Sequence, residues 1–131
     1  ASAEEGGWVI TCRDLPEAIS QAEATEDRED VASGCLQAAL EARIRHEMEL
    51  PQPSKPKARE VLIAPPAGTA AKAALYVAMR EAGVSKMELA RRLGVDEKEV
   101  RRMLDPGHGS KLPRIAEAIE ALGRQLRIAL A

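Results

Sequence analysis

The chain has 131 residues, 45% of them hydrophobic and 31% charged, and this composition excludes a disordered or low-complexity protein. No apolar run approaches the roughly 18 residues that a bilayer-spanning helix needs, and no signal peptide opens the sequence, so we expect a cytoplasmic protein with no membrane partner. The net charge of −2 is unevenly distributed: residues 1–54 hold 4 Lys/Arg and 12 Asp/Glu, whereas residues 55–131 hold 15 and 9. The basic half suits phosphate and the acidic half suits a basic protein, although two solvated faces of one fold would give the same totals.

The first residues predict two short strands. Trp8, Ile10 and Cys12 alternate with Val9, Thr11 and Arg13, as in a half-buried strand. Pro16 ends the run because proline cannot donate to a strand ladder. Before this strand, paired glycines predict a turn over residues 1–7, and after it residues 18–22 predict a second strand.

A long helix is predicted next. Thr25 or Asp27 can cap its first amide groups, and the helix is expected to end before Pro51 because a residue that precedes proline disfavours the helical region. One apolar stripe runs along it, made of Val31, Ala32, Cys35, Leu36, Ala39 and Leu40. The two cysteines, Cys12 and Cys35, fit no disulfide framework or metal spacing and are expected to be buried free thiols in a reducing compartment.

A proline-rich segment separates this region from the rest of the chain. Residues 51–57 hold three prolines, which stiffen a linker. We therefore predict a first domain over residues 1–54, a linker over residues 55–69 with a short strand at 60–64, and a second domain over residues 70–131.

The second domain is predicted to be helical. An amphipathic helix runs from about residue 70 to Gly83, which stands where a left-handed cap belongs. Two capping-box patterns, Ser85-x-x-Glu88 and Asp96-x-x-Glu99, mark two further helix starts. A longer helix is predicted from Pro113 to Gly123, and a final strand is predicted over residues 126–130.

The segment from Lys86 to Asp105 fits a helix-turn-helix motif. A small residue, Ala90, stands where the second helix would cross the first, and four residues later Gly94 supplies the positive φ that the turn needs. The residues expected to lock the two helices together are Leu89, Ala90, Leu93, Gly94, Val95, Val100 and Met103.

In this motif the second helix lies in the major groove of duplex DNA. Arginine can pair bidentately with guanine, glutamate can accept from cytosine N4, and lysines at the flanks can contact phosphate. The DNA-binding residues expected on these grounds are Lys86, Glu97, Lys98, Arg101, Arg102 and Lys111. A solvated helix face, or a helical pair used only for protein contacts, would give the same pattern.

Short motifs in a fixed order resemble the HicB antitoxins. They are GGWVIT at 6–11, DLPEA at 14–18, Gln21 and a Pro-x-Pro-Ser ending at 51–54. The stretch from Asp105 to Leu112 is similar to the subtype with a carboxy-terminal helix-turn-helix. The resemblance implies an α+β protein, in which a partial RNase-H-like domain of short antiparallel strands and a helix binds and blocks HicA, a small basic mRNA-cleaving ribonuclease. It also implies Trp8, Asp14 and Glu17 as toxin-binding residues, and a homodimer that represses its own operon.

Three departures from the family pattern affect these expectations. Only ASAEE precedes the paired glycines where the family has its first strand, so we expect that strand to be truncated here. The family's Gly-x-Thr after Gln21 is replaced by residues 22–25, AEAT, which leaves the end of the second strand open. Lys86 stands where a glutamine is common and puts a charge where an amide usually contacts the DNA backbone.

Other functions find little support in the sequence. Nuclease chemistry of the RNase H type needs several carboxylates converging on a divalent metal, and only Asp14 is closely tied to a strand end. His46 and His108 are far apart and have no cysteine at ligand spacing, so we expect no enzyme, no metal and no cofactor. The rival hypothesis is a stand-alone helix-turn-helix repressor without a toxin partner. The sequence does not decide between a dimer and a tetramer.

Overall fold

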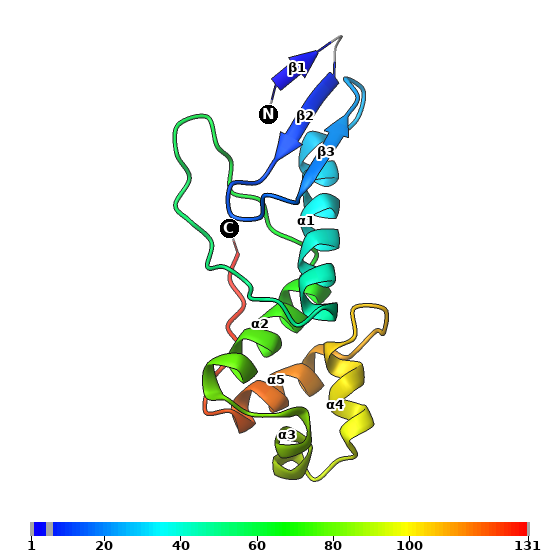
Figure 1. The fold of residues 1–131 in the computed structure, drawn as a ribbon, viewed down its shortest axis with the longest axis vertical. Helices are drawn as coiled ribbons and strands as arrows, with labels where there is room; N and C mark the ends of the chain where they lie inside the picture. Colours follow the sequence, from blue (N-terminus) through cyan, green and yellow to red (C-terminus); the bar gives the residue numbers. More distant parts are fainter. Residues whose placement is uncertain (1, 5–6, 131) are drawn as a thin grey trace. The chain divides into compact units, whose positions relative to one another are not determined.

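The computed structural model describes residues 2–4 and 7–130, with side chains from residue 7 onward. Within these residues it contains three strands and five helices (Figure 1), namely β1 Ser2–Glu4, β2 Gly7–Thr11, β3 Ile19–Ala22, α1 Arg28–Arg45, α2 Ala67–Ala82, α3 Lys86–Leu93, α4 Glu97–Leu104 and α5 Leu112–Ala121. The fold is α+β, as expected. The chain divides into two compact units, residues 1–67 and 68–131. None of the helices described is long and apolar enough to cross a membrane.

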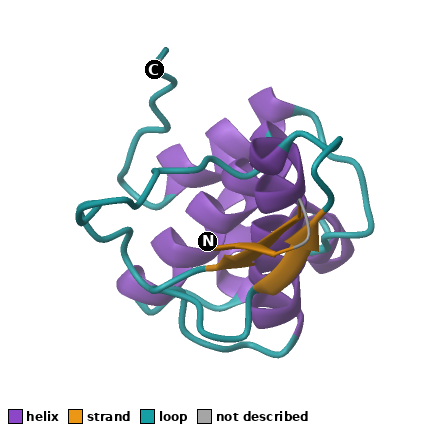
Figure 2. Ribbon diagram, turned by 90° about the horizontal axis from the view of Figure 1, so that it is seen from above, coloured by secondary structure: helices purple, strands orange, loops and turns teal. Residues whose placement is uncertain are grey.

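The three strands form one antiparallel sheet, drawn in orange in Figure 2. Their order in the sheet is β1-β2-β3, as the labels in Figure 1 show. Trp8 of β2 lies opposite Ala22 of β3, so the strand predicted from alternation and the second strand predicted within residues 18–22 are both confirmed. The prediction of a turn over residues 1–7 is wrong for its first part, because Ser2–Glu4 pairs with β2 as a strand. The hydrogen bonds available at the edge of β2 outweigh the polar composition of this segment. The remaining part of that turn, residues 5 and 6, lies outside the described residues.

Helix α1 begins where Asp27 caps it. The Asp27 carboxylate accepts from the backbone N–H of Glu29 at 2.9 Å and of Asp30 at 3.4 Å. Of the two predicted caps, Thr25 and Asp27, the helix therefore uses Asp27. The acidic side chains of Glu29 and Asp30 also suit the positive end of the helix dipole. The helix packs against β3, and the apolar cluster of this unit consists of Leu15, Ala18 and Ala39, with Cys12, Cys35, Leu36 and Leu40 packed against it.

Helix α1 ends at Arg45, earlier than the position before Pro51 that the sequence suggested. Glu47 adopts a positive φ of 54°, and the next amide, of Met48, donates to the carbonyl of Arg43 at 2.8 Å. These contacts form a Schellman motif, which closes a helix through its own carbonyls without proline.

The strand predicted over residues 60–64 is wrong, because this segment has no regular secondary structure. Arg59 has a positive φ of 68°, and the amide of Glu60 donates to the carbonyl of Lys57 at 3.0 Å. The resulting turn breaks the extended run before Val61. Residues 55–67, which we expected to form most of the linker, belong to the first compact unit.

The second unit is built from α2 to α5 around one core. Its largest fully buried side chains are Leu75, Leu89, Val100 and Ile115, one from each helix. The helices predicted from apolar spacing and caps are therefore confirmed. The final strand predicted over residues 126–130 is wrong for the single chain, since no described strand pairs with this segment and Ile128 and Leu130 are exposed.

Candidate functional site

Helices α3 and α4 are joined by a tight connection, Gly94 to Asp96. Gly94 has φ 67° and ψ 33°, the left-handed conformation that glycine adopts at no steric cost. The Ser85 hydroxyl accepts from the amide of Glu88 at 3.1 Å and starts α3, while the Asp96 carboxylate accepts from the amide of Lys98 at 2.8 Å and starts α4. Local chemistry therefore determines both where the two helices begin and how sharply the chain turns between them.

The contact between α3 and α4 is apolar. Leu89, Ala90, Val100 and Met103 are buried, and Leu93 and Val95 are half-buried. The small side chain of Ala90 in α3 and the β-branched side chain of Val100 in α4 are among these buried residues. The polar residues of both helices are consequently directed to the other faces.

The glutamates of the two capping-box patterns take part in ion pairs with arginines. The Glu88 carboxylate accepts from Arg91 at 2.6 Å and from Arg92 at 3.2 Å, and these hydrogen bonds lower the pKa of Glu88 to about 2. Arg92 also donates to the carbonyl of Ala121 at 3.3 Å, which fastens α3 to the end of α5. Sequence reasoning did not select these two arginines, although they stand one after the other in α3.

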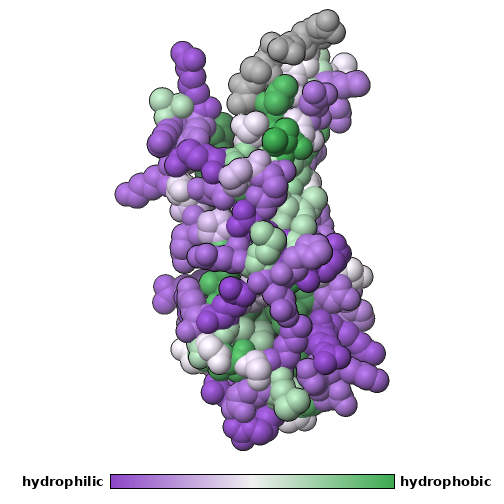
Figure 3. Space-filling model, viewed as in Figure 1, coloured by the Kyte–Doolittle hydropathy of each residue, from purple (hydrophilic) through white to green (hydrophobic). Residues whose placement is uncertain are grey.

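The outward face of α4 carries alternating charges. Arg101 donates to Glu97 at 3.0 Å and Arg102 donates to Glu99 at 3.2 Å, each pair lying within one turn of the helix. Both arginine side chains remain more than half exposed, and Lys98 between the glutamates is exposed as well. In the space-filling view, hydrophilic side chains cover the region where Figure 1 places α4 (Figure 3). The glutamates hold the guanidinium groups in place without removing them from solvent.

The two flanking lysines predicted to contact phosphate lie at the starts of other helices. Lys86 is the first residue of α3 and is half-buried. Lys111 is the N-cap residue of α5 and is exposed, directly after the loop that joins α4 to α5. Of the six predicted DNA-binding residues, the structure thus brings four together on α4 and places one at the start of each of the two neighbouring helices in the chain.

One charged residue of this unit is buried and was missed by the sequence analysis. Lys72 of α2 keeps only 6% of its surface exposed. Its position in the apolar stripe of α2, three residues before Leu75 and four before Tyr76, was the signal that could have identified it. Its ammonium group donates to main-chain carbonyls at the end of α4.

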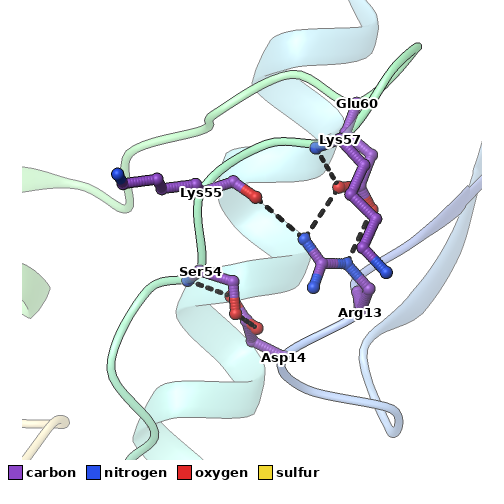
Figure 4. Close-up of polar contacts among 6 residues, drawn as sticks. All are labelled: Arg13, Asp14, Ser54, Lys55, Lys57 and Glu60. Atoms are coloured by element: carbon purple, nitrogen blue, oxygen red, sulfur yellow. Dashed lines mark hydrogen bonds and ion pairs between the residues drawn. The ribbon is translucent and has the colours of Figure 1, made fainter.

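In the first unit, the carboxylate of Asp14 binds the chain's own backbone. Asp14 Oδ2 accepts from the amide of Ser54 at 2.9 Å, and Asp14 Oδ1 accepts from the Ser54 hydroxyl at 2.5 Å (Figure 4). These hydrogen bonds lower the pKa of Asp14. A residue predicted to bind toxin therefore also anchors the segment that follows α1.

Arg13, next to Asp14, holds the same segment at further points. Its guanidinium donates to both carboxylate oxygens of Glu60, at 3.0 and 2.9 Å, and to the carbonyl of Lys55 at 3.0 Å (Figure 4). The bond from Arg13 is the main cause that lowers the pKa of Glu60 to about 2. Farther along, Ser33 of α1 donates to the carbonyl of Ala64 at 2.9 Å. We call residues 54–64 the strap, because side chains of the β2–β3 loop and of α1 tie it down.

Glu17 and Trp8, the other predicted toxin-binding residues, also have partners within the chain. Arg43 donates to Glu17 through Nε at 2.5 Å and Nη2 at 2.9 Å, and this pairing lowers the pKa of Glu17 to about 2. Half-buried Trp8 has the guanidinium carbon of Arg28 at 3.9 Å from the centre of its ring. Glu17 thus links the β2–β3 loop to α1, and Trp8 links β2 to α1.

Exposed acidic side chains surround the start of α1 and supply the negative charge of this unit. They are Glu23, Glu26, Asp27, Glu29 and Asp30. The two cysteines are free and half-buried rather than fully buried, and burial raises the pKa of Cys35. Among residues 2–4 and 7–130, no three His, Cys, Asp or Glu side chains are placed so that together they could hold a metal ion.

Comparison with known proteins places the chain among bacterial antitoxins. It is 33% identical over 125 residues to Antitoxin HicB 2 of Photorhabdus laumondii subsp. laumondii, covering 95% of this chain and 88% of the relative. It is 32% identical to Antitoxin HicB of Pseudomonas fluorescens over 97% of this chain and 88% of the relative, and 29% identical to Antitoxin HicB of Escherichia coli K12 over 98% and 93%. The family model described as a HicB-like antitoxin of bacterial toxin-antitoxin systems matches residues 1–74. The chain therefore belongs to the HicB-like antitoxin family.

Proposed function

We propose that this antitoxin acts through two surfaces, one in each unit. The first unit binds and blocks a small, basic, mRNA-cleaving ribonuclease of the HicA type. The second unit binds duplex operator DNA and represses the antitoxin's own operon. The observation that carries the DNA-binding half is the outward face of α4, where exposed arginines are held by glutamates on a helix whose other face is buried.

The α3–α4 pair supports a helix-turn-helix assignment on several grounds. The connection is short, Gly94 has the required positive φ, and Val100 and Met103 bury the inner face of the second helix. Residues 68–131 also carry 12 Lys/Arg against 8 Asp/Glu, which gives this unit a net positive charge. In our proposal α4 enters the major groove, where its side chains contact base edges, while Lys86 and Lys111 contact phosphates.

Gel shifts with the full chain test this half of the proposal. Duplexes from the promoter region of its own operon are compared with scrambled duplexes of the same length and composition. We expect tighter binding to the promoter duplex, and an affinity that falls steeply with salt because phosphate neutralisation releases counterions. Equal affinity for both duplexes at every salt concentration would leave α4 without a role in sequence reading.

The acidic surface of the first unit supports the toxin-binding half. Residues 1–67 carry 7 Lys/Arg against 13 Asp/Glu, and much of this charge is exposed around the start of α1. A protein that binds RNA presents positive potential, so an acidic partner associates with it quickly and competes with the substrate. The three-stranded antiparallel sheet and α1 also support a partial RNase-H-like domain as the scaffold.

Co-expression tests this half. We expect a small basic reading frame beside the gene; its product is expressed alone and together with the full antitoxin, and growth and co-purification are measured. We expect toxicity of the small protein alone, rescue by the antitoxin and a stable complex. The rival hypothesis, a stand-alone repressor, predicts no such reading frame and no complex.

A further inference from the structure

Lys72, in the second unit, has no role in the DNA contacts proposed above. It lies in α2, and its side chain is almost completely buried. Lysine is rarely buried to this degree unless its ammonium group has specific partners, because removing the charge from water is costly. The partners of Lys72 therefore indicate what the residue does.

Within the described part of the chain, the ammonium group of Lys72 has acceptors on α4 and on the loop that follows it. Nζ donates to the carbonyl of Arg102 at 3.0 Å, to the carbonyl of Met103 at 3.0 Å and to the hydroxyl of Ser110 at 3.2 Å. The Ser110 hydroxyl in turn lies 3.3 Å from the carbonyl of Arg102, to which it donates. Lys72 thus links α2 to the last turn of α4 and to the loop that leads to Lys111.

The position suits a positive charge. The carbonyls of the last turn of a helix have no partners within the helix, and they form the negative end of its dipole. A lysine ammonium has three N–H donors, so it can satisfy two such carbonyls and a neighbouring hydroxyl together.

We propose that Lys72 is a positioning residue for sequence-specific DNA binding, an inference that rests on the DNA-binding function proposed above. By holding the end of α4 and Ser110 in one hydrogen-bonded group, Lys72 fixes Arg101 on α4 relative to Lys111 beyond the loop. The base-reading side chain and the phosphate-binding side chain then meet the duplex in one register. Lys72 itself is buried and does not contact phosphate.

The proposal predicts different effects of a Lys72 substitution on sequence-specific and on non-specific DNA binding. Replacing Lys72 leaves every exposed cation in place, so non-specific binding and its salt dependence, which follow the number of neutralised phosphates, should change little. Specific binding should fall, because base contacts need a defined register. A residue needed only for folding would lower thermal stability without changing the ratio of the two affinities.

The test uses the full chain with Lys72→Met, which keeps the length and the apolar stem of the side chain. Affinities for promoter and scrambled duplexes are measured well below the melting temperature, at several salt concentrations. We expect promoter affinity to fall by about 10-fold or more, the range for losing a hydrogen-bonded charged group, and scrambled-duplex affinity to stay within about 2-fold. Lys98→Met is the matched contrast, because it removes an exposed lysine of α4 and should lower both affinities and the salt slope.

Two further variants keep the proposal falsifiable if Lys72→Met does not fold. Ser110→Ala removes one acceptor outside the core and should lower promoter affinity in the same direction by a smaller factor. Lys72→Arg keeps the charge and the donors and should retain more of the promoter preference than Lys72→Met or Lys72→Gln. If wild type prefers the promoter and the folded Lys72 and Ser110 variants keep that preference in full, the positioning role is overturned while the proposed function stands. If wild type shows no preference, both fail together.

Discussion

In the proposed complex with DNA, Arg101 would contact a base and Lys111 a phosphate, and a single experiment can separate these two roles. Arg101 is exposed on α4 beside Glu97, and Lys111 is exposed at the start of α5. Arg101→Ala should cost roughly 1–3 kcal/mol of binding free energy on the promoter duplex and relax the preference at one base pair. Lys111→Ala should weaken binding to all duplexes alike and reduce the salt slope. Gel shifts with single-base-pair variants of the promoter give both results.

Equal losses on promoter and scrambled duplexes for Arg101→Ala would contradict the base-reading role. Glu97→Gln serves as the control for the pair, because it keeps the length of the side chain and removes the charge that holds Arg101. We expect it to reduce discrimination less than Arg101→Ala does.

The paired carboxylates of the first unit predict how its stability depends on pH. Pairing with Arg43 lowers the pKa of Glu17, and pairing with Arg13 lowers that of Glu60, each from 4.5 to about 2. A lowered pKa in the folded state contributes stability that is fully present above pH 4.5 and is lost as the pH falls towards 2. The urea midpoint of the first unit should therefore decrease across this window, and less steeply in the variant with both Glu17→Gln and Glu60→Gln.

The chain contains the probes for this measurement. Trp8 is its only tryptophan and lies in the first unit, whereas Tyr76 is its only tyrosine and lies in the second. Glu88→Gln is the matched control, because it removes a carboxylate with a similarly lowered pKa from the second unit. An unchanged acid dependence of the Trp8 signal in the double variant would show that other groups govern it.

Among individual residues, the sequence allowed us to predict those whose hydrogen-bond partners lie nearby in the chain. Asp27, Ser85 and Asp96 cap helices through amides two or three residues away, and the sequence contains that information. It did not predict Lys72 or Arg13, whose partners are 30 to 47 residues away. A lysine in an apolar stripe can be assigned a role only when the location of the carbonyls it reaches is known.

Among the helices and turns, two glycines have opposite roles: one lies in a left-handed turn between helices and the other lies inside a helix. Gly94→Ala places a side chain at φ 67° and should destabilise the second unit by about 1–2 kcal/mol. Gly34→Ala lies within α1, where an added Cβ has no neighbour within 4 Å, and should stabilise the first unit by about 0.5–1 kcal/mol. Thermal or urea unfolding followed by Tyr76 and Trp8 fluorescence measures the two effects separately. A stabilised Gly94→Ala variant would be incompatible with the backbone described here.

The helices could be predicted from the sequence because caps and apolar spacing act over a few residues. The two predicted strands that the structure lacks show why strands are harder to predict in this way. Apolar residues cluster at 60–64 and alternate at 126–130, but a strand also needs a neighbouring strand to accept its hydrogen bonds. At 60–64, the turn at Arg59 and the bond from Ser33 to Ala64 engage the backbone in other ways.

For the molecule as a whole, the exposed apolar carboxy-terminal segment leads us to predict a homodimer. Ile128 and Leu130 are exposed in the single chain, and a helix-turn-helix protein normally needs two copies to cover both half-sites of an operator. We expect these segments to pair between two chains, which would supply the missing strand partner. Light scattering of the full chain at micromolar concentration should give twice the 14.1 kDa of one chain, or four times if dimers pair.

Deletion of residues 126–131 should shift the mass towards that of one chain and weaken promoter binding. The double substitution Ile128→Ser and Leu130→Ser should act in the same direction without shortening the chain. A full-length monomer whose mass the deletion does not change would exclude pairing through this segment.

The strap also determines when the first unit can be completed during synthesis. Arg13 and Asp14 are synthesised before their partners, because Ser54 follows Asp14 by 40 residues and Glu60 follows Arg13 by 47 residues. Domains made in this order fold from the amino-terminal end, and a loop can close only after both of its ends exist. The contacts of Asp14 and Arg13 with this segment can therefore form only after Ser54 and Glu60 have been synthesised and released from the ribosome. A chain that stalls or is cut before Glu60 therefore carries a sheet and α1 whose connecting loop is only partly anchored.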